Sequence, residues 1–306
     1  LIEENGINEK IAKDWLDKIR RNFKDLNHKT KRAIENPTPG KETPELISIR
    51  TSMPYWILEY FSNYFGDKYS SKDLYDIFES FLHSATLGTR VNQRLIKRDM
   101  LLQAFLNQDY KCTAGKMSPA SILFQKRALL MSTKEYKKGL FEVQDEGSQM
   151  ISYAVAPEPG WKILDACAGA GGKSLHLADL QEDRGNIIAA DVIKGKLFAL
   201  SKRMRRPGVR SIKTFPWNSK DKPPPEMKKS SFDAVLVDAP CSGTGTIRRM
   251  PYHKWRLDED LLKRLTNKQL SILKEYSEYV KPGGILVYAT CSIMPQENDE
   301  IAGKFL

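Results

Sequence analysis

Two cysteines that each follow an apolar run constrain the fold of this chain more than any other feature. Cys241 comes shortly after the run 232–237, and Cys291 after the run 285–289. Runs that are apolar almost throughout are typical of parallel strands covered on both faces. Ligands of such sheets bind at the carboxyl ends of the strands, so we expect both thiols where chemistry takes place. A single cysteine there would more often be a small buried apolar residue, but two in Gly-, Ser- and Thr-rich turns favour a function.

Strands and helices alternate from residue 144 onward, which predicts an α/β domain with a doubly wound, mostly parallel sheet and right-handed crossovers. The long last helix is expected to stop at the Pro and Gly residues of 281–284. The patterns predict strands at 161–165, 186–191, 211–215, 232–237 and 285–289, and helices at 145–156, 173–180, 194–206 and 261–280.

The chain before residue 144 does not show this regular alternation of strands and helices. Apolar residues at helical spacing predict helices over 7–35, from 52 onward and over 71–85, with Ser52 as an N-cap and Pro54 in the first turn. An extended segment at 89–92, a helix over 99–106 and short elements at 120–131 and 139–144 indicate a small α+β module. We therefore expect a helical region (1–84), a small α+β module (85–143) and a catalytic domain (144–306).

The charge of the chain favours a polyanionic partner. Lys+Arg number 49 against 38 Asp+Glu, a net charge of +11, and nucleic acid is the first candidate for such an excess. Two basic clusters could each be a solvated face or an RNA contact. The first comprises Arg90, Arg94, Lys97 and Arg98, and the second Lys194, Lys196, Lys202, Arg203, Arg205, Arg206, Arg210 and Lys213.

Cysteine and histidine usage argues against a metal site. The four cysteines are widely spaced without a C-x-x-C pair, and only four histidines are present, so no zinc pattern can be assembled. Free cysteines fit a reducing compartment, and we expect a cytoplasmic monomer. No apolar run is long enough to span a membrane, and the charged first twenty residues do not form a signal peptide. Residue 1 is Leu, so we expect the native chain to begin earlier.

A glycine-rich turn after the first strand of the α/β domain predicts a nucleoside site. Its glycines let the backbone approach a ligand, and the next helix presents free N–H groups. The spacing fits neither a dinucleotide fingerprint nor a P-loop. Asp165 would repel a pyrophosphate, whereas Asp191 stands where a ribose acceptor is expected. The cationic, phosphate-free S-adenosylmethionine is the better match. The candidate cofactor residues are Ala166, Cys167, Ala168, Gly169, Ala170, Gly171, Gly172, Lys173, Asp191 and Asp238.

Several segments together resemble the RNA cytosine-C5 methyltransferases of the RsmB/NSUN family. The paired Asp-Ala-Pro-Cys and Thr-Cys-Ser segments are the most specific, the likeness covers roughly residues 85–300, and Ser52 to Trp56 is similar to a segment of the bacterial ribosomal RNA members. The segments are 165–173, 238–243, 248–251 with Trp255, and 288–292 with Glu297 and Asn298, preceded by 90–92 and 143–148.

The resemblance implies a Rossmann-like methyltransferase core behind an RNA-recognition-like module, with S-adenosylmethionine as donor and a cytosine in RNA, ribosomal first and transfer RNA next, as substrate. Carried over from the family, Cys291 is the nucleophile and Cys241 assists release. Asp238, beside both, can bind the N3/N4 edge of the base. Asn218 stands where the family usually has an acid that contacts the adenine side of the cofactor, so the resemblance adds Asn218 to the candidate cofactor residues. The family also continues with two further strands, so we expect a truncated chain with an exposed strand at 285–290.

Two alternatives remain open at this point. A catalytically silent RNA-binding ribosome-assembly factor would have no need of both thiols. A DNA cytosine methyltransferase would use Cys241, not Cys291, as the nucleophile, and the Thr290 to Ser292 segment together with the upstream module weighs against it.

Overall fold

The computed structural model describes residues 43–125, 128–217 and 222–306, apart from the side chain of Asp67. It divides into two compact units, one formed by the chain up to Ala85 together with Gly245–Asp258, the other by Thr86–Thr244 together with Glu259–Leu306. The helix expected over 7–35 lies outside the described residues. Within the described ranges, no helix is long and apolar enough to cross a membrane.

The first unit is helical. It contains α3 (Pro44–Thr51), α4 (Tyr55–Phe65), the 3-10 turn η1 (Gly66–Lys68) and α5 (Ser71–Ser80). A capping box between Ser70 and Asp73 starts α5. The expectation that Ser52 caps α4 is wrong, because Ser52 ends α3 with a left-handed backbone at φ 52° and Pro54 directly precedes α4. The helix expected over 71–85 ends at Ser80.

A segment from the catalytic half of the sequence also belongs to the first unit. It includes the end of the 3-10 turn η3 (Thr244–Thr246) and the short helix α11 (His253–Arg256). Lys254 is only 6% exposed, and its Nζ donates to the carbonyl oxygen of Thr51 at 3.3 Å. Arg248 donates through Nη2 to the carbonyl oxygen of Ser84 at 3.0 Å. These contacts hold the segment on the N-terminal helices, which the sequence pattern did not indicate.

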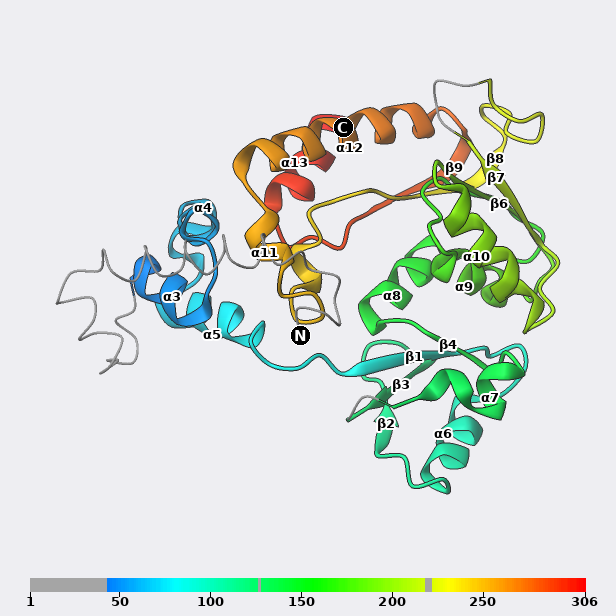
Figure 1. The fold of residues 1–306 in the computed structure, drawn as a ribbon. Coiled ribbons are helices and arrows are strands. Elements are labelled where there is room, and N and C mark those ends of the chain that lie inside the picture. Colours follow the sequence, from blue (N-terminus) through cyan, green and yellow to red (C-terminus); the bar gives the residue numbers. More distant parts are fainter. Residues whose placement is uncertain (1–42, 126–127, 218–221) are drawn as a thin grey trace. The chain divides into compact units, whose positions relative to one another are not determined.

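The second unit begins with a small antiparallel sheet in the order β2-β3-β1-β4 (Figure 1). Phe105 of the helix α6 packs edge-on against Phe124 and Phe141 of the sheet, at ring-centroid distances of 5.2 and 5.5 Å. The predicted helix over 99–106 is confirmed, whereas β2 was not foreseen. The elements are β1 (Leu87–Val91), α6 (Arg98–Leu106), β2 (Cys112–Ala114), β3 (Ser121–Phe124), η2 (Leu130–Ser132), α7 (Lys134–Lys137) and β4 (Phe141–Val143).

The rest of the second unit is the predicted doubly wound α/β domain. Its sheet has the order β7-β6-β5-β8-β9, and all neighbouring strands are parallel (Figure 1). The strands are β5 (Lys162–Asp165), β6 (Asn186–Asp191), β7 (Ile212–Pro216), β8 (Phe232–Asp238) and β9 (Val280–Ala289). The helices are α8 (Glu146–Val155), α9 (Gly172–Leu180), α10 (Lys194–Arg205), α12 (Glu259–Ser277) and α13 (Asp299–Phe305), with the turn η4 (Pro295–Glu297).

Both faces of this sheet are covered, which explains the apolar runs. Ile163 of β5 joins a core cluster with residues of α8, α9 and α10, while its neighbour Leu164 joins a second cluster with residues of α12 and α13. Successive residues of a strand point to opposite faces. Each strand therefore needs apolar residues at consecutive positions rather than at alternate ones.

The expected end of the long helix at 281–284 is wrong. Helix α12 ends at Ser277, and residues 281–284 lie within β9. They form a bulge, because Val280 pairs with Phe232 and Ile285 with Ala234. Gly283 adopts φ 74°, a left-handed conformation that glycine takes without a steric penalty. Beyond the bulge the pairing with β8 is regular up to Ala289, so the two cysteine-bearing loops leave the sheet side by side.

Candidate active site

The two predicted thiols lie together at the carboxyl ends of β8 and β9. The Sγ atoms of Cys241 and Cys291 are 3.2 Å apart, and the backbone N–H of Cys291 donates to the Sγ of Cys241 at 3.3 Å. Cys291 is exposed and Cys241 is partly buried. The prediction that both cysteines meet at one edge of the sheet is therefore confirmed in its geometry.

The surroundings of the two thiols make them chemically unequal. The hydrogen bond from the Cys241 thiol lowers the pKa of Cys291 to about 7, and the nearby ammonium of Lys173 acts in the same direction. The same hydrogen bond and burial raise the pKa of Cys241. The thiolate is the nucleophilic form of a cysteine, and these contacts favour it at Cys291 over Cys241.

A buried carboxylate connects the two cysteine loops. Glu297 is fully buried, and its Oε1 accepts hydrogen bonds from the backbone N–H of Ser242 and from Nε2 of Gln269, both at 2.8 Å. Its Oε2 accepts a hydrogen bond from the hydroxyl of Ser242. The same Nε2 of Gln269 also donates to the carbonyl oxygen of Pro240 at 3.0 Å. Helix α12 and the loop after β9 thus fix the backbone on both sides of Cys241.

The loop that carries Cys291 is held by a second set of hydrogen bonds. Nδ2 of Asn298 donates to the carbonyl oxygens of Ser292 and Met294 at 3.0 and 2.9 Å. The hydroxyl of Thr290 donates to Oδ1 of Asn298 at 2.6 Å. The hydroxyls of Ser292 and Thr244 are 2.9 Å apart, which links this loop to the one after β8. The resemblance had singled out Glu297 and Asn298, but Gln269 sits in an amphipathic helix where a glutamine reads as solvent-facing.

Asp238 ends β8 beside the thiols, and its Oδ2 forms an ion pair with Nζ of Lys173 at 2.5 Å. The side chains are 27% and 14% exposed. Lys173 belongs to the first turn of α9 and lies close enough to Cys291 to affect its pKa. This ion pair places one fixed negative and one fixed positive charge between the glycine-rich turn and the thiols.

A cavity of about 690 Å³ opens at this edge of the sheet. One wall is the glycine-rich turn, and another is helix α12, which contributes Ile272 and Tyr276. Its volume lies in the range of about 300–1,000 Å³ that is usual for small-molecule sites. Of the candidate cofactor residues, the cavity is lined by Ala166 to Ala170, Gly172, Lys173, Asp191 and Asp238, but not by Gly171. Asn218 lies outside the described residues.

Asp191 closes the side of the cavity at the end of β6. Its Oδ2 accepts from the backbone N–H of Gly169 at 2.9 Å, and its Oδ1 from that of Ile193 at 2.8 Å. A carboxylate offers about four lone-pair sites, so both oxygens keep capacity for a further donor. Gly169 and Gly171 have φ values of 57° and 78°. These left-handed conformations, which favour glycine, let the turn curl around the end of β5.

Two buried groups on the floor of the cavity have raised pKa values. Burial raises the pKa of Asp165 to about 7, although the hydroxyl of Ser174 donates to its Oδ2 at 2.6 Å. Its Oδ1 is buried without a hydrogen-bond partner. Burial, together with the charge of Asp165, also raises the pKa of Cys167 to about 12. At neutral pH Cys167 is therefore a neutral thiol, which argues against it as the nucleophile.

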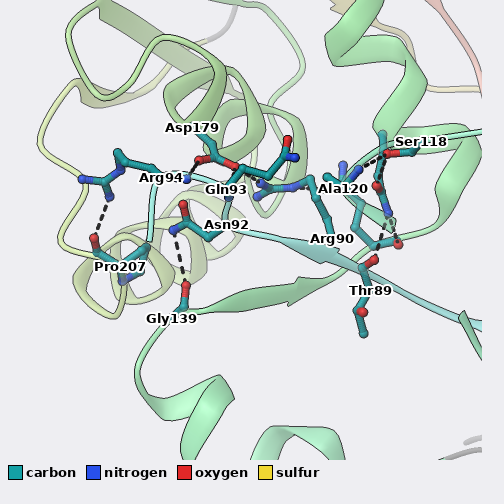
Figure 2. A network of polar contacts seen from close by, with 12 residues as sticks. Thr89, Arg90, Asn92, Gln93, Arg94, Ser118, Ala120, Gly139, Asp179 and Pro207 are labelled. Atoms are coloured by element: carbon teal, nitrogen blue, oxygen red, sulfur yellow. Dashed lines mark hydrogen bonds and ion pairs between the residues drawn. The ribbon is translucent and has the colours of Figure 1, made fainter. Parts of the chain in front are cut away.

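The structure corrects the interpretation of both basic clusters. Arg90 is 2% exposed and pairs with Asp179 at 3.1 Å, and Arg94 donates to the carbonyl oxygen of Pro207 at 2.7 Å (Figure 2). In the second cluster, Arg203 and Arg206 both form ion pairs with a carboxylate of β4. Arg90 therefore belongs to neither kind of face, whereas the other three arginines make contacts within the protein and keep 20–22% of their side chains exposed.

Within the described ranges, no group of three or more His, Cys, Asp or Glu side chains could hold a metal ion.

The sequence of this chain is similar to those of several known proteins. Residues 152–306 match the family described as 16S rRNA methyltransferase RsmB/F. A protein of Bacillus subtilis named "Probable ribosomal RNA small subunit methyltransferase B" is 32% identical over 274 residues, which cover 90% of this chain and 59% of that protein. The Proteus mirabilis protein named "Ribosomal RNA small subunit methyltransferase B" is 30% identical over 83% of this chain and 58% of its own length. The chain thus spans somewhat over half the length of these relatives.

Solved structures share the fold. A structure described as a methyltransferase homolog protein from Pyrococcus horikoshii superposes with a TM-score of 0.70 at 26% identity, covering 84% of this chain and 79% of that one. NSun6 from the same organism gives a TM-score of 0.70 at 19% identity, with 82% and 86% covered. The sequence match and the fold lead to one conclusion: this chain belongs to the RsmB/F family of methyltransferases.

Proposed function

We propose that this chain transfers a methyl group from S-adenosylmethionine to C5 of a cytosine in RNA. Ribosomal RNA is the first candidate substrate, in line with the names of the relatives, and transfer RNA is the next. The observation that carries the proposal is the pair of thiols, 3.2 Å apart, beside a cavity that ends at Asp238.

The cavity suits S-adenosylmethionine better than a nucleotide with phosphates. Asp191 can accept hydrogen bonds from a ribose diol, and Ile272 and Tyr276 offer an apolar wall to a flat base. Asp165, Asp191 and Asp238 all line the cavity, and this set of acids would repel a pyrophosphate but tolerate a cationic sulfonium. When bound, the cofactor supplies an electrophilic methyl group.

The thiols answer the main chemical difficulty of the reaction, because C5 of cytosine is a weak nucleophile. The thiolate of Cys291 adds to C6 of the base, and the displaced electron pair makes C5 enamine-like. C5 then takes the methyl group. Water takes the C5 proton with the assistance of Cys241, the C5–H bonding pair moves into the ring, and the Cys291 thiolate is expelled. Asp238 accepts a hydrogen bond from the N4 amino group at the N3/N4 edge of the base and so holds the base in position over the thiolate.

The alternatives fit the site less well. A DNA-type arrangement would need Cys241 to attack, but Cys241 is the less exposed thiol and its pKa is raised. A silent assembly factor would have no use for a buried carboxylate that connects two thiol loops. We further propose that the chain acts as a monomer in the cytoplasm, because its four free cysteines suit a reducing compartment.

The test is 5-methylcytosine formation. Unmodified small-subunit ribosomal RNA, transfer RNA and a cytosine-containing DNA duplex are each incubated with the protein and S-adenosylmethionine bearing a labelled methyl group, and the nucleosides are separated by mass spectrometry. We expect label in 5-methylcytidine from ribosomal RNA and none after Cys291→Ala. Label in DNA, label on another base, or no label in any substrate would each refute the proposal.

A further inference from the structure

Cys291 has the two properties that make a cysteine sensitive to peroxides. It is exposed to solvent, and hydrogen bonding from the Cys241 thiol lowers its pKa to about 7. Thiolates that solvent can reach are the cysteines that peroxides oxidise. The Sγ of Cys241 lies 3.2 Å away, in direct contact. An oxidised Cys291 therefore faces a second thiol, the arrangement in which oxidation stops at a disulfide.

The course of the main chain suits a bond between these sulfurs. Asp238 pairs with Ala289 in the parallel ladder, and the N–H of Ala239 donates to the carbonyl oxygen of Ala289 at 2.9 Å. Paired strands lie about 4.8 Å apart, which is within the range of about 4.4–6.8 Å between the Cα atoms of bridged cysteines. The two loops thus leave the sheet at a suitable spacing. From 3.2 Å, the sulfurs need to approach by roughly 1 Å to reach the S–S bond length of about 2.0 Å.

The hydrogen bonds that position the thiols for methyl transfer also keep them together for oxidation. Glu297 holds Ser242, the neighbour of Cys241, through its backbone N–H. Asn298 holds the carbonyl oxygen of Ser292, the neighbour of Cys291. The hydroxyl oxygens of the two serines are 3.1 Å apart. Because two groups that are held in contact react far faster than two free molecules, the second thiol is positioned to capture an oxidised Cys291.

The other two cysteines do not share these properties. Cys112 is 6% exposed in the core of the small antiparallel sheet, and burial raises its pKa. Burial also raises the pKa of Cys167 to about 12. Neither presents a thiolate to solvent at neutral pH, so oxidation should begin at Cys291.

We propose that Cys291 is a modification site for hydrogen peroxide and that Cys241 converts the oxidised sulfur into a reversible disulfide. The disulfide withdraws the thiolate that adds to C6 of the base, so methyl transfer stops until the bond is reduced. This consequence rests on the proposed function, whereas the oxidation chemistry does not. The active site is thereby also a switch that peroxide turns off and a dithiol turns on.

The chemistry takes place in two steps. The thiolate of Cys291 attacks one oxygen of hydrogen peroxide, an S–O bond forms, the O–O bond breaks, and the departing hydroxide takes up a proton to become water. The sulfur of Cys241 then attacks the sulfur of the sulfenic acid, the S–S bond forms, the S–O bond breaks, and hydroxide leaves as water with the proton of Cys241. Two thiols are oxidised and one peroxide is reduced, which gives one disulfide and two molecules of water.

The experiment follows oxidation through the masses of the intact protein and of its peptides, which requires no methyl-transfer assay. The unaltered protein, Cys241→Ala, Cys291→Ala and Cys112→Ala are treated with a small excess of hydrogen peroxide and then with dithiothreitol. Cys112→Ala is the matched control, because it removes a thiol outside the active site. Melting temperatures verify that each variant is folded, and 5-methylcytidine formation is measured in parallel.

We expect the unaltered protein and the control to lose two hydrogens, with the peptides of Cys241 and Cys291 joined. Methyl transfer should fall in proportion to the disulfide and return completely with dithiothreitol. In Cys241→Ala, Cys291 should instead gain two oxygens as a sulfinic acid that dithiothreitol does not reverse. Cys291→Ala should form no disulfide.

The proposal is wrong if peroxide leaves both thiols of the folded protein free, or if Cys291 becomes a sulfinic acid whether or not Cys241 is present. A disulfide that leaves methyl transfer intact would exclude the switch. A protein that forms the disulfide with peroxide but makes no 5-methylcytidine even when reduced would refute the proposed function and still support the modification site.

Discussion

The carboxylate of Glu297 accepts a 2.8 Å hydrogen bond from the backbone amide of Ser242, and through it the loop that follows Cys291 holds the loop that carries Cys241. Glu297 therefore helps to fix the distance between the two thiols through the backbone of Ser242 rather than through the thiols themselves. This arrangement makes Glu297 a positioning residue, and its effect should appear in the chemical step and not in cofactor binding.

We expect Glu297→Gln to lower kcat about 10- to 100-fold, because one buried acceptor becomes a donor facing other donors. The affinity for S-adenosylmethionine, measured by calorimetry, should stay unchanged. Glu300→Gln, a partly exposed change in α13, is the control. A kcat equal to that of the unaltered protein would show that Glu297 does not position the thiols, and a matched loss of cofactor affinity would show that it acts on the whole fold.

The two thiols should give opposite phenotypes. Cys291→Ala should bind RNA without forming a covalent adduct. Cys241→Ala should methylate once and remain attached, with release slowed at least about 100-fold, the usual scale of an assisted proton transfer. On a denaturing gel with labelled RNA, only Cys241→Ala should give a persistent slow-migrating band. A band from Cys291→Ala instead would assign the nucleophile to Cys241, and full activity of both variants would exclude the thiol mechanism.

The reactivity of Cys291 should depend on pH and on its neighbour. The hydrogen bond from Cys241 lowers the pKa of Cys291 to about 7, and only the thiolate is alkylated. Its alkylation by iodoacetamide, followed by peptide mass spectrometry, should accelerate as the pH rises through about 7 and then level off. In Cys241→Ala the inflection should move up toward the ordinary value of 9.0. An unmoved inflection would mean that another group lowers the pKa.

Asp165 should make the protein less stable at high pH. Burial raises its pKa from 3.8 to about 7 in the folded state, so its contribution is fully present below the unfolded pKa and is lost as the pH rises through about 7. Asp165→Asn should remove this loss, which is on the order of 2–4 kcal/mol. Urea unfolding at about pH 5 and about pH 8, with the exposed Asp299→Asn as control, measures it. An equal pH dependence in Asp165→Asn would refute the prediction.

The sequence predicted those parts of the fold that depend on local pattern. The strand β6 has the predicted bounds, because its buried apolar run is ended by a polar residue on each side. The meeting of Cys241 and Cys291 followed from the rule that the ends of parallel strands share one edge. The bulge at 281–284 was missed, because Pro and Gly after a helix normally mark a loop and not a strand.

What the sequence could not predict depends on contacts between distant residues. Arg90 was interpreted as part of a solvated or RNA-binding face, yet it is buried because Asp179, 89 positions away, supplies the opposite charge. Lys254 is buried against Thr51, 203 positions earlier. The side chain of Gln144 accepts a hydrogen bond from Nε of Arg90, 54 positions earlier, and no local pattern predicts that contact. From sequence alone, a charged or amide side chain is predicted to face solvent, because the distant partner that would let it be buried cannot be identified.

The ion pair between Arg90 and Asp179 limits where this chain can be cut for an excised core or joined to a relative in a chimera. Among the residues that the structure describes, the donors to Asp179 are the side chain of Arg90 and the backbone amides of Gln93 and Arg94, and these precede the family match at 152–306. A core excised at residue 152 would carry a buried carboxylate in α9 stripped of these partners, a strongly destabilising change. A chimera that exchanges the catalytic domain must therefore also exchange the chain from Thr86 onward, and the natural unit of transplantation is larger than the catalytic domain.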